Sequence, residues 1–306
     1  MSLSKFDAKW IGINATYNLP KSPPYCEFPD DVLRYMKENA NPKQSFKLMN
    51  VIKYFVPKKG CPFTYFGKEY FDDEYALWNE NSLSVYAPES FEYNFNELPN
   101  NLGISGRLSV WDGRALPKLI SKIIVCDIKY LCLSTPRISY SAFKFLTASG
   151  KLKELELEKT IVTLKNGFVV PYETLLENTP KLRILKMTYD PQKRLSKKIV
   201  QKICESNLEK LVLDGLTDDF KLESFLDVIA KKKPNLDIHL DFECSFNTRR
   251  NIYSYMDKVI RAGSPASFPP HFELNYIVFS SHFDVCRKTY ENIRNEYRQR
   301  QLNLIN

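Results

Sequence analysis

KLKELELE (residues 151–158) places Leu152, Leu155 and Leu157 in the spacing LxxLxL. Since alternate residues of a β-strand point to the same face, Leu155 and Leu157 would share the buried face of a short strand. The same spacing recurs in IKYLCL (128–133), PKLRILKM (180–187), NLEKLVLDGL (207–216) and ELNYIVF (273–279). Five copies of one buried-strand pattern indicate a repeated structural unit.

Weaker copies fill the gaps between these segments. They are NSLSVY (81–86), GRLSVW (106–111) and NLDIHLDF (235–242). Successive copies are mostly about 23 to 30 residues apart, close to the period of leucine-rich repeats. The last interval is longer, which indicates an enlarged terminal unit or a C-terminal cap.

The segments between the copies carry helix signals. PYETLLENTP has Pro171 at a first-turn position, and Gly263 ends the apolar pattern of NTRRNIYSYMDKVIRAG. Leu222, Phe225, Leu226 and Ile229 follow helical spacing, with Asp218 or Asp219 as the expected N-cap of that helix. We therefore predict the α/β class and, over residues 61–280, a leucine-rich-repeat solenoid with a parallel sheet and outer helices. An ordinary α/β domain with evenly spaced strands is the alternative.

Composition narrows the function classes. The 306 residues include 44 Lys and Arg against 36 Asp and Glu, for a net charge of +8, and the two signs are mostly interleaved. This balance does not favour nucleic acid, although an RNA-associated basic protein stays an alternative. The seven cysteines form no CxxC pair, the N-terminus has no signal-peptide pattern, and no run is apolar enough for a membrane span. We expect a cytoplasmic or nuclear protein that does not contact membranes.

Catalytic motifs are missing from the sequence. It contains no HExxH, GxSxG, GxGxxG or phosphate-binding GxxxxGK[ST] pattern. The paired aspartates lie at predicted helix starts or in loops, where capping explains them. We predict no enzyme, no catalytic residues, no metal and no cofactor.

The N-terminal region reads as a polar tail over residues 1–24 followed by a helical segment over residues 25–60. That segment resembles an F-box. The resemblance rests on Phe28-Pro29, Asp30-Asp31, Val32-Leu33, Asn41-Pro42, Phe46, Leu48, Val51 and Lys53-Tyr54. Phe28 replaces the usual leucine, and Tyr54 or Phe55 stands where tryptophan is usual. Residues 281–306 read as a C-terminal helical tail.

The resemblance implies a substrate-recognition subunit of an SCF-type cullin–RING ubiquitin ligase. The F-box-like segment would dock a Skp-family adaptor and, through it, a cullin. The residues expected at that contact are Phe28, Pro29, Val32, Leu33, Met36, Phe46, Leu48, Met49, Val51, Tyr54 and Phe55. One alternative stays open: the segment only caps the first repeat of a scaffold without a ligase link. If residues 61–78 form that cap instead, the segment is free to bind.

The residues between the core positions of each strand would face the concave side of a solenoid and bind an unidentified protein target. This set is Tyr86, Trp111, Glu156, Glu158, Lys186, Thr188, Asp214, His239 and Asp241. Exposed aromatics often anchor interfaces, and the carboxylates would form an acidic stripe that suits a basic target.

Overall fold

The computed structural model describes residues 28–40, 44, 48, 64–66, 75–79, 82–86, 91–98, 100, 102–189, 195–243, 245–263, 265, 267–274 and 281–305. The chain divides into two compact units, Met1–Ile128 and Lys129–Asn306. The division falls inside the segment predicted as one solenoid.

The first unit contains a mixed sheet. Its described elements are α2 (Asp30–Asn39), β1 (Thr64–Phe66), β2 (Tyr75–Asn79), β3 (Ser82–Tyr86), β4 (Phe91–Asn94), the 3₁₀ helix η2 (Phe95–Glu97), β5 (Leu102–Val110) and α4 (Leu116–Lys122). β2 and β1 run parallel to β5, whereas β3 runs antiparallel to both β2 and β4. Trp78, Leu83 and Leu108 are fully buried and belong to the core.

The prediction of a parallel repeat strand at Leu83 and Val85 is wrong. Only two positions separate the end of β2 at Asn79 from the start of β3 at Ser82. A parallel partner needs a crossover of roughly a dozen residues or more, so this short connection can join only antiparallel strands. Leu83 is still buried, but as part of a β-meander.

The second unit is built on parallel strands. β6 (Ile123–Leu133) enters it from Lys129 onward, followed by β7 (Arg137–Ser139), α5 (Tyr140–Thr147), β8 (Glu154–Leu157), β9 (Ile161–Thr163), α6 (Tyr172–Glu177), β10 (Ile184–Thr188), α7 (Lys197–Glu205), β11 (Lys210–Leu216), α8 (Leu222–Lys232), β12 (Asp237–Phe242), α9 (Phe246–Ala262), β13 (His271–Leu274) and α10 (Ser281–Ile305). The strand order is β6-β8-β10-β11-β12-β13, and each described pairing is parallel. β7 and β9 pair separately. The predicted α/β class, with a mostly parallel sheet flanked by helices, is confirmed.

The leucines of the repeated pattern stand opposite one another across these strands. Leu131, Leu155, Leu185, Leu211 and Ile238 form one continuous row of Cα partners. Leu133, Leu157, Met187, Leu213, Leu240 and Phe272 form the next core row. Every member of both rows is at most 7% exposed, so each strand contributes the same two positions to the core.

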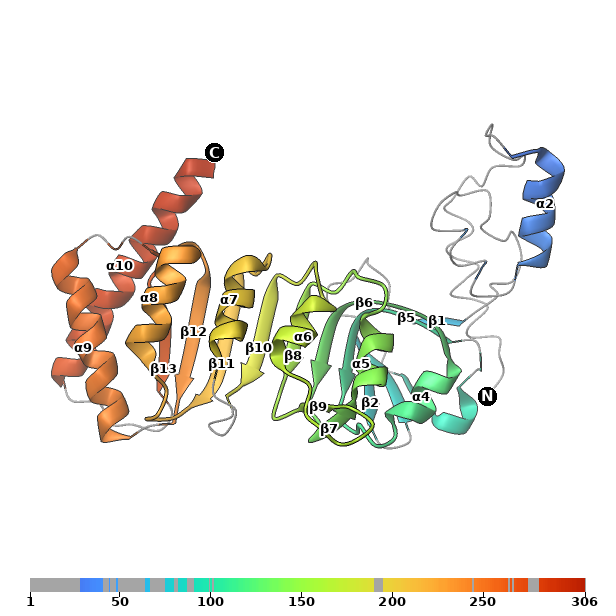
Figure 1. The fold of residues 1–306 in the computed structure, drawn as a ribbon, viewed down its shortest axis with the longest axis horizontal. Helices are drawn as coiled ribbons and strands as arrows, with labels where there is room; N and C mark the ends of the chain where they lie inside the picture. Colours follow the sequence, from blue (N-terminus) through green and yellow to red (C-terminus); the bar gives the residue numbers. More distant parts are fainter. Residues whose placement is uncertain are drawn as a thin grey trace. The chain divides into compact units, whose positions relative to one another are not determined.

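Helices α5, α6, α7 and α8 cover one face of this sheet (Figure 1). The apolar stripe of α8, Leu222, Phe225, Leu226 and Ile229, is buried as its spacing predicts. Serine side chains begin three helices: Ser139, Ser196 and Ser245 each accept a backbone N–H three residues ahead, at 3.0 to 3.2 Å. α9 ends at Ala262, and its C-cap residue Gly263 has a φ of 68°, a conformation that costs glycine little.

The last strand begins earlier than the sequence pattern predicts. In β13, Phe272 pairs with Leu240 and Leu274 pairs with Phe242, so the copy based on Leu274, Ile277 and Phe279 has the wrong register. Ile277 and Phe279 lie outside the described residues. The aromatic contact between Phe242 and Phe272, with ring centroids 6.5 Å apart, favours the observed register.

Candidate functional site

The sheet of the second unit has a second face that helices α5 to α8 do not cover (Figure 1). We call it the open face. One row of side chains on it runs Cys132, Glu156, Lys186, Val212, His239 and His271, in register across six strands. These residues are half-buried while the core residues on either side of them are buried. The predicted target residues Glu156, Lys186 and His239 therefore share one row.

A second row follows at the carboxyl ends of the strands. Thr188 is the Cα partner of Asp214, and Asp241 is the partner of Glu273. Glu158, which follows β8, is exposed. Burial raises the pKa of Asp214, and the carboxylates of Asp241, Glu156 and Glu273 raise it further against the opposing effect of Lys186. The open face therefore holds more negative charge here than its cations neutralise.

Lys186 is the cation that counteracts these carboxylates. Its Nζ lies 2.7 Å from Glu154 Oε1 and 3.7 Å from Glu156 Oε2. Glu154 was not among the predicted target residues, although it lies two positions before Glu156 on the same face of β8. Sequence alternation alone could have identified it.

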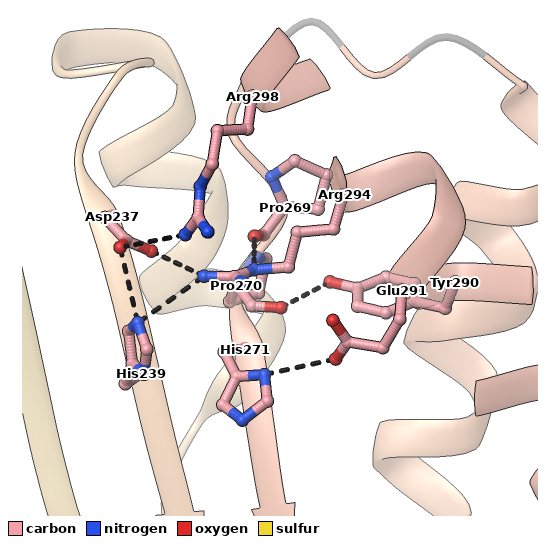
Figure 2. Close-up of polar contacts among 9 residues, drawn as sticks. All are labelled: Asp237, His239, Pro269, Pro270, His271, Tyr290, Glu291, Arg294 and Arg298. Carbon is pink, nitrogen blue, oxygen red and sulfur yellow. Dashed lines mark hydrogen bonds and ion pairs between the residues drawn. The ribbon is translucent and has the colours of Figure 1, made fainter. Parts of the chain in front are cut away.

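The β12 and β13 end of the open face contacts α10. Figure 2 shows Arg294 reaching Asp237 and His239 of β12 and the carbonyl of Pro269. Arg294 Nη2 donates to Asp237 Oδ1 at 2.6 Å, and its Nε donates to Pro269 O at 3.1 Å. The Arg294 guanidinium also stacks over the Phe268 ring at 4.9 Å. Arg294 is buried, so this contact joins α10 firmly to the sheet.

Further polar contacts surround that arginine. Glu291 Oε1 lies 3.1 Å from His271 Nδ1, and the Tyr290 hydroxyl donates to Pro270 O at 2.8 Å (Figure 2). The rings of His239 and His271 have centroids 5.0 Å apart. Arg294 of α10 thus already contacts His239, which the sequence predicts as a target residue. Sequence alternation could have identified Asp237, two positions before His239 on the same face of β12, whereas His271, Glu291 and Arg294 could not be predicted because their partners lie 20 to 57 positions away.

Two predicted aromatic anchors belong to the first unit. Trp111 follows β5 and is 54% exposed, as an interface anchor requires. Its backbone N–H donates to Trp78 O at 2.9 Å. Tyr86 lies in β3, and its side chain is outside the part of the chain that the structure describes. Their predicted role in target binding stays a prediction.

The described part of the N-terminal segment is an amphipathic helix, α2, whose apolar residues are only partly buried. Leu33 of α2 is buried at 2% exposure, and Met36 is half-buried. Phe28, Val32 and Tyr35 are 60%, 37% and 67% exposed. Pro29, the N-cap residue of α2, is exposed, and Leu48 is half-buried. Phe46, Met49, Val51, Tyr54 and Phe55 lie outside the described residues.

The described residues contain no group of three or more His, Cys, Asp or Glu that could hold a metal ion. Within the same residues, no helix combines the length and the apolar character that crossing a membrane would require. No protein-family model and no curated protein matches the sequence.

Proposed function

We propose that the chain is a protein-binding adaptor whose repeats form a leucine-rich-repeat solenoid. The support is the register of the two core rows. The equivalent apolar positions of neighbouring strands are Cα partners in both rows. Strand–helix units that cannot bury their apolar faces alone gain stability by such stacking. A solenoid of this kind leaves its uncovered sheet face available for a partner.

The N-terminal segment gives the adaptor its second contact. We propose that this segment acts as an F-box, docks a Skp-family adaptor and links the chain to a cullin–RING ubiquitin ligase in the cytoplasm or nucleus. The observation that carries this proposal is the exposed apolar surface on α2 and just before it. Leu33 packs inward, while Phe28, Val32 and Tyr35 present apolar surface to solvent. Exposed apolar patches of this kind mark protein contacts.

The open face of the second unit supplies the target contact in this proposal. Its excess of carboxylates around Asp214 favours a basic protein surface. The same charges disfavour RNA on this face, because a phosphate backbone would meet like charge. α10 limits the available surface at β12 and β13, so the target contact is centred on β8, β10 and β11.

The test is co-precipitation of the full chain with a purified Skp-family adaptor. Val32→Asp should reduce adaptor binding by about tenfold or more, because it places a charge in an apolar contact. Val228→Asp is the matched control: Val228 is 38% exposed on α8 and Val32 is 37% exposed on α2. The control should bind the adaptor like the unchanged chain.

Equal adaptor binding by Val32→Asp and the unchanged chain would reject the F-box assignment. Failure of the unchanged chain to bind any Skp-family adaptor would do the same. Either result favours the alternative of a leucine-rich-repeat scaffold in which the N-terminal segment is a cap, which fits the burial of Leu33. Leu33 itself is not a useful site for this test, because Leu33→Asp would place a charge in a buried position.

A further inference from the structure

A hairpin in the second unit carries apolar side chains in solvent. It spans residues 161–170, from β9 to the segment before α6. Leu164, Phe168 and Val169 are 42%, 70% and 39% exposed. Val162 and Val170, at the base of the same hairpin, are buried. The hairpin is therefore anchored in the core and presents its apolar tip outward.

Backbone hydrogen bonds fix the shape of this tip. The Leu164 N–H donates to Phe168 O at 2.8 Å, and the Gly167 N–H donates to Leu164 O at 2.9 Å. Gly167 has a φ of 83°, which suits a three-residue hairpin turn closed by glycine. Asn166 Oδ1 accepts from the Phe168 N–H at 3.2 Å. A partner would therefore lose little free energy in ordering the tip.

The turn that leads into the hairpin is held to two neighbouring strands. The Lys159 N–H donates to Thr188 Oγ1 of β10 at 3.1 Å, with Lys159 at a φ of 49°. The buried Thr160 hydroxyl donates to Leu133 O at 2.7 Å and accepts from the Thr135 N–H at 3.1 Å. A lysine with a positive φ persists only where surrounding contacts fix the backbone conformation. Such positions are frequent at functional sites.

Most charges near the tip are basic, and the exception is exposed Glu158 beside Lys159. Residues 161–170 contain no Asp or Glu, and Lys165 is exposed in the turn itself. Lys159 is exposed in the preceding turn, and Arg137 is exposed on β7, opposite Ile161 of β9. A complementary surface would combine an apolar pocket with carboxylates at its rim.

We infer that this hairpin inserts Phe168 and Leu164 into an apolar, acid-rimmed pocket of a folded protein target. The inference rests on the proposed target-binding function and names a contact outside the open face. A bilayer is disfavoured, because one lysine adds about 1 kcal/mol near anionic lipid and even a myristoyl chain binds membranes only marginally. A second copy of this chain is also disfavoured, because a stable dimer buries about 800 Å² per partner and one aromatic contributes about 150–250 Å², whereas the proposed target gains further area at the open face.

The first experiment locates the target. The photo-crosslinking residue p-benzoylphenylalanine replaces Lys165 in the full chain, and a parallel chain carries it in place of exposed Lys198 on α7. Irradiation in cells should join a protein to position 165 that is not joined to position 198. That protein is then purified, and its Kd is measured by calorimetry. An equal pattern at both positions would overturn the inference.

The second experiment tests the contact on that purified protein. Phe168→Ala should raise Kd by about tenfold or more, and Lys165→Glu should also raise Kd. Phe246→Ala is the matched control, since Phe246 is 77% exposed on α9, and it should leave Kd within about twofold. An unchanged Kd in Phe168→Ala would overturn the inference, as would Phe168-dependent binding to phosphatidylcholine–phosphatidylserine vesicles or Phe168-dependent dimerisation.

Adaptor binding separates this inference from the proposed function. Phe168→Ala should co-precipitate the Skp-family adaptor like the unchanged chain, and Val32→Asp should retain the Kd for the crosslinked target. Loss of target binding in Phe168→Ala with no adaptor binding in any variant would reject the ligase proposal and keep the hairpin contact.

Discussion

Asp218 caps a helix whose N-cap residue, Ser245, lies 27 positions further along the chain than the aspartate itself. Its Oδ1 accepts from the Thr248 backbone N–H at 3.1 Å and also from the hydroxyls of Ser245 and Thr248, at the start of α9. The sequence predicts Asp218 or Asp219 as the N-cap of α8, and that prediction is wrong. Lys221 occupies the N-cap position of α8 without a side-chain capping bond.

Asp218→Ala should lower the free energy of unfolding by about 1 kcal/mol, as the loss of an N-terminal cap does. Asp219→Ala is the control, because Asp219 is exposed and accepts from the nearby Thr217 hydroxyl. Urea denaturation at neutral pH measures both changes. Equal effects of the two substitutions would mean that Asp218 does not stabilise α9.

The pattern of the repeats made the core of the second unit predictable. The LxxLxL spacing identifies the alternate buried positions of each strand, and more than twenty residues between copies leave room for a crossover helix. Leu155, Leu185 and Leu211 stand opposite one another for this reason. The same reasoning fails at Leu83, because the two-position connection before it can join only antiparallel strands, whatever the spacing of the copies.

The candidate site was only half predictable. Alternation along a strand correctly placed Glu156, Lys186 and His239 on one face, since that depends on local geometry alone. The contacts of α10 depend on residues far apart in the chain: Arg294 and Asp237 are 57 positions apart. No local pattern encodes such a pair. A buried arginine on a helix rich in charged residues gives no signal until the fold brings its acceptors together.

Arg294→Ala should destabilise the second unit by about 3 kcal/mol, because it leaves Asp237 without its closest cation and Pro269 O without its donor. Arg298→Ala should cost less than about 1 kcal/mol. Arg298 is 3.6 Å from Asp237 and its side chain is 48% exposed. Chemical denaturation measures both. A smaller effect for Arg294→Ala than for Arg298→Ala would contradict the account of α10 docking.

Glu291 makes the docking of α10 dependent on pH. The hydrogen bond from His271 and the charges of Arg294 and Arg287 outweigh burial and lower the pKa of Glu291 from its ordinary value of 4.5. The lowered pKa means that Glu291 stabilises the fold fully above the unfolded pKa, and the stabilisation is lost as pH falls through the folded pKa. Glu291→Gln should therefore be less stable than the unchanged chain at about pH 6, with a gap that narrows towards about pH 3. A gap that is constant with pH, in urea melts, would contradict this account.

Lys159→Gly should stabilise the fold by about 0.5–1 kcal/mol. Lysine at a φ of 49° is strained, whereas glycine adopts this region readily and keeps the N–H that donates to Thr188. Lys165→Gly serves as the control, because Lys165 does not have a positive φ. Thermal denaturation distinguishes them: Lys165→Gly should not raise the melting temperature. A loss of stability in Lys159→Gly would show that the lysine side chain stabilises the fold by more than the backbone strain costs.

Asp214→Asn and Asp237→Asn should change stability in opposite directions, although both residues lie on the open face. Burial and three neighbouring carboxylates raise the pKa of Asp214, so its charged form costs free energy above that pKa and Asn removes the cost. Burial also acts to raise the pKa of Asp237, but the hydrogen bond from His239 and the charges of His239, Arg294 and Arg298 lower it overall.

At neutral pH we therefore expect Asp214→Asn to gain about 0.5 kcal/mol, a typical cost of like charges on neighbouring strands, and Asp237→Asn to lose stability. The Asp214→Asn gain should shrink in high salt and disappear once pH falls below the raised pKa. The same substitution should weaken the binding of a basic target. The Asp214 carboxylate repels the neighbouring carboxylates in the free chain, and the same charge attracts a cation of the target. Denaturation across pH and salt measures the first effect, and a stability loss in Asp214→Asn would show that the carboxylates of the open face are neutralised within the fold.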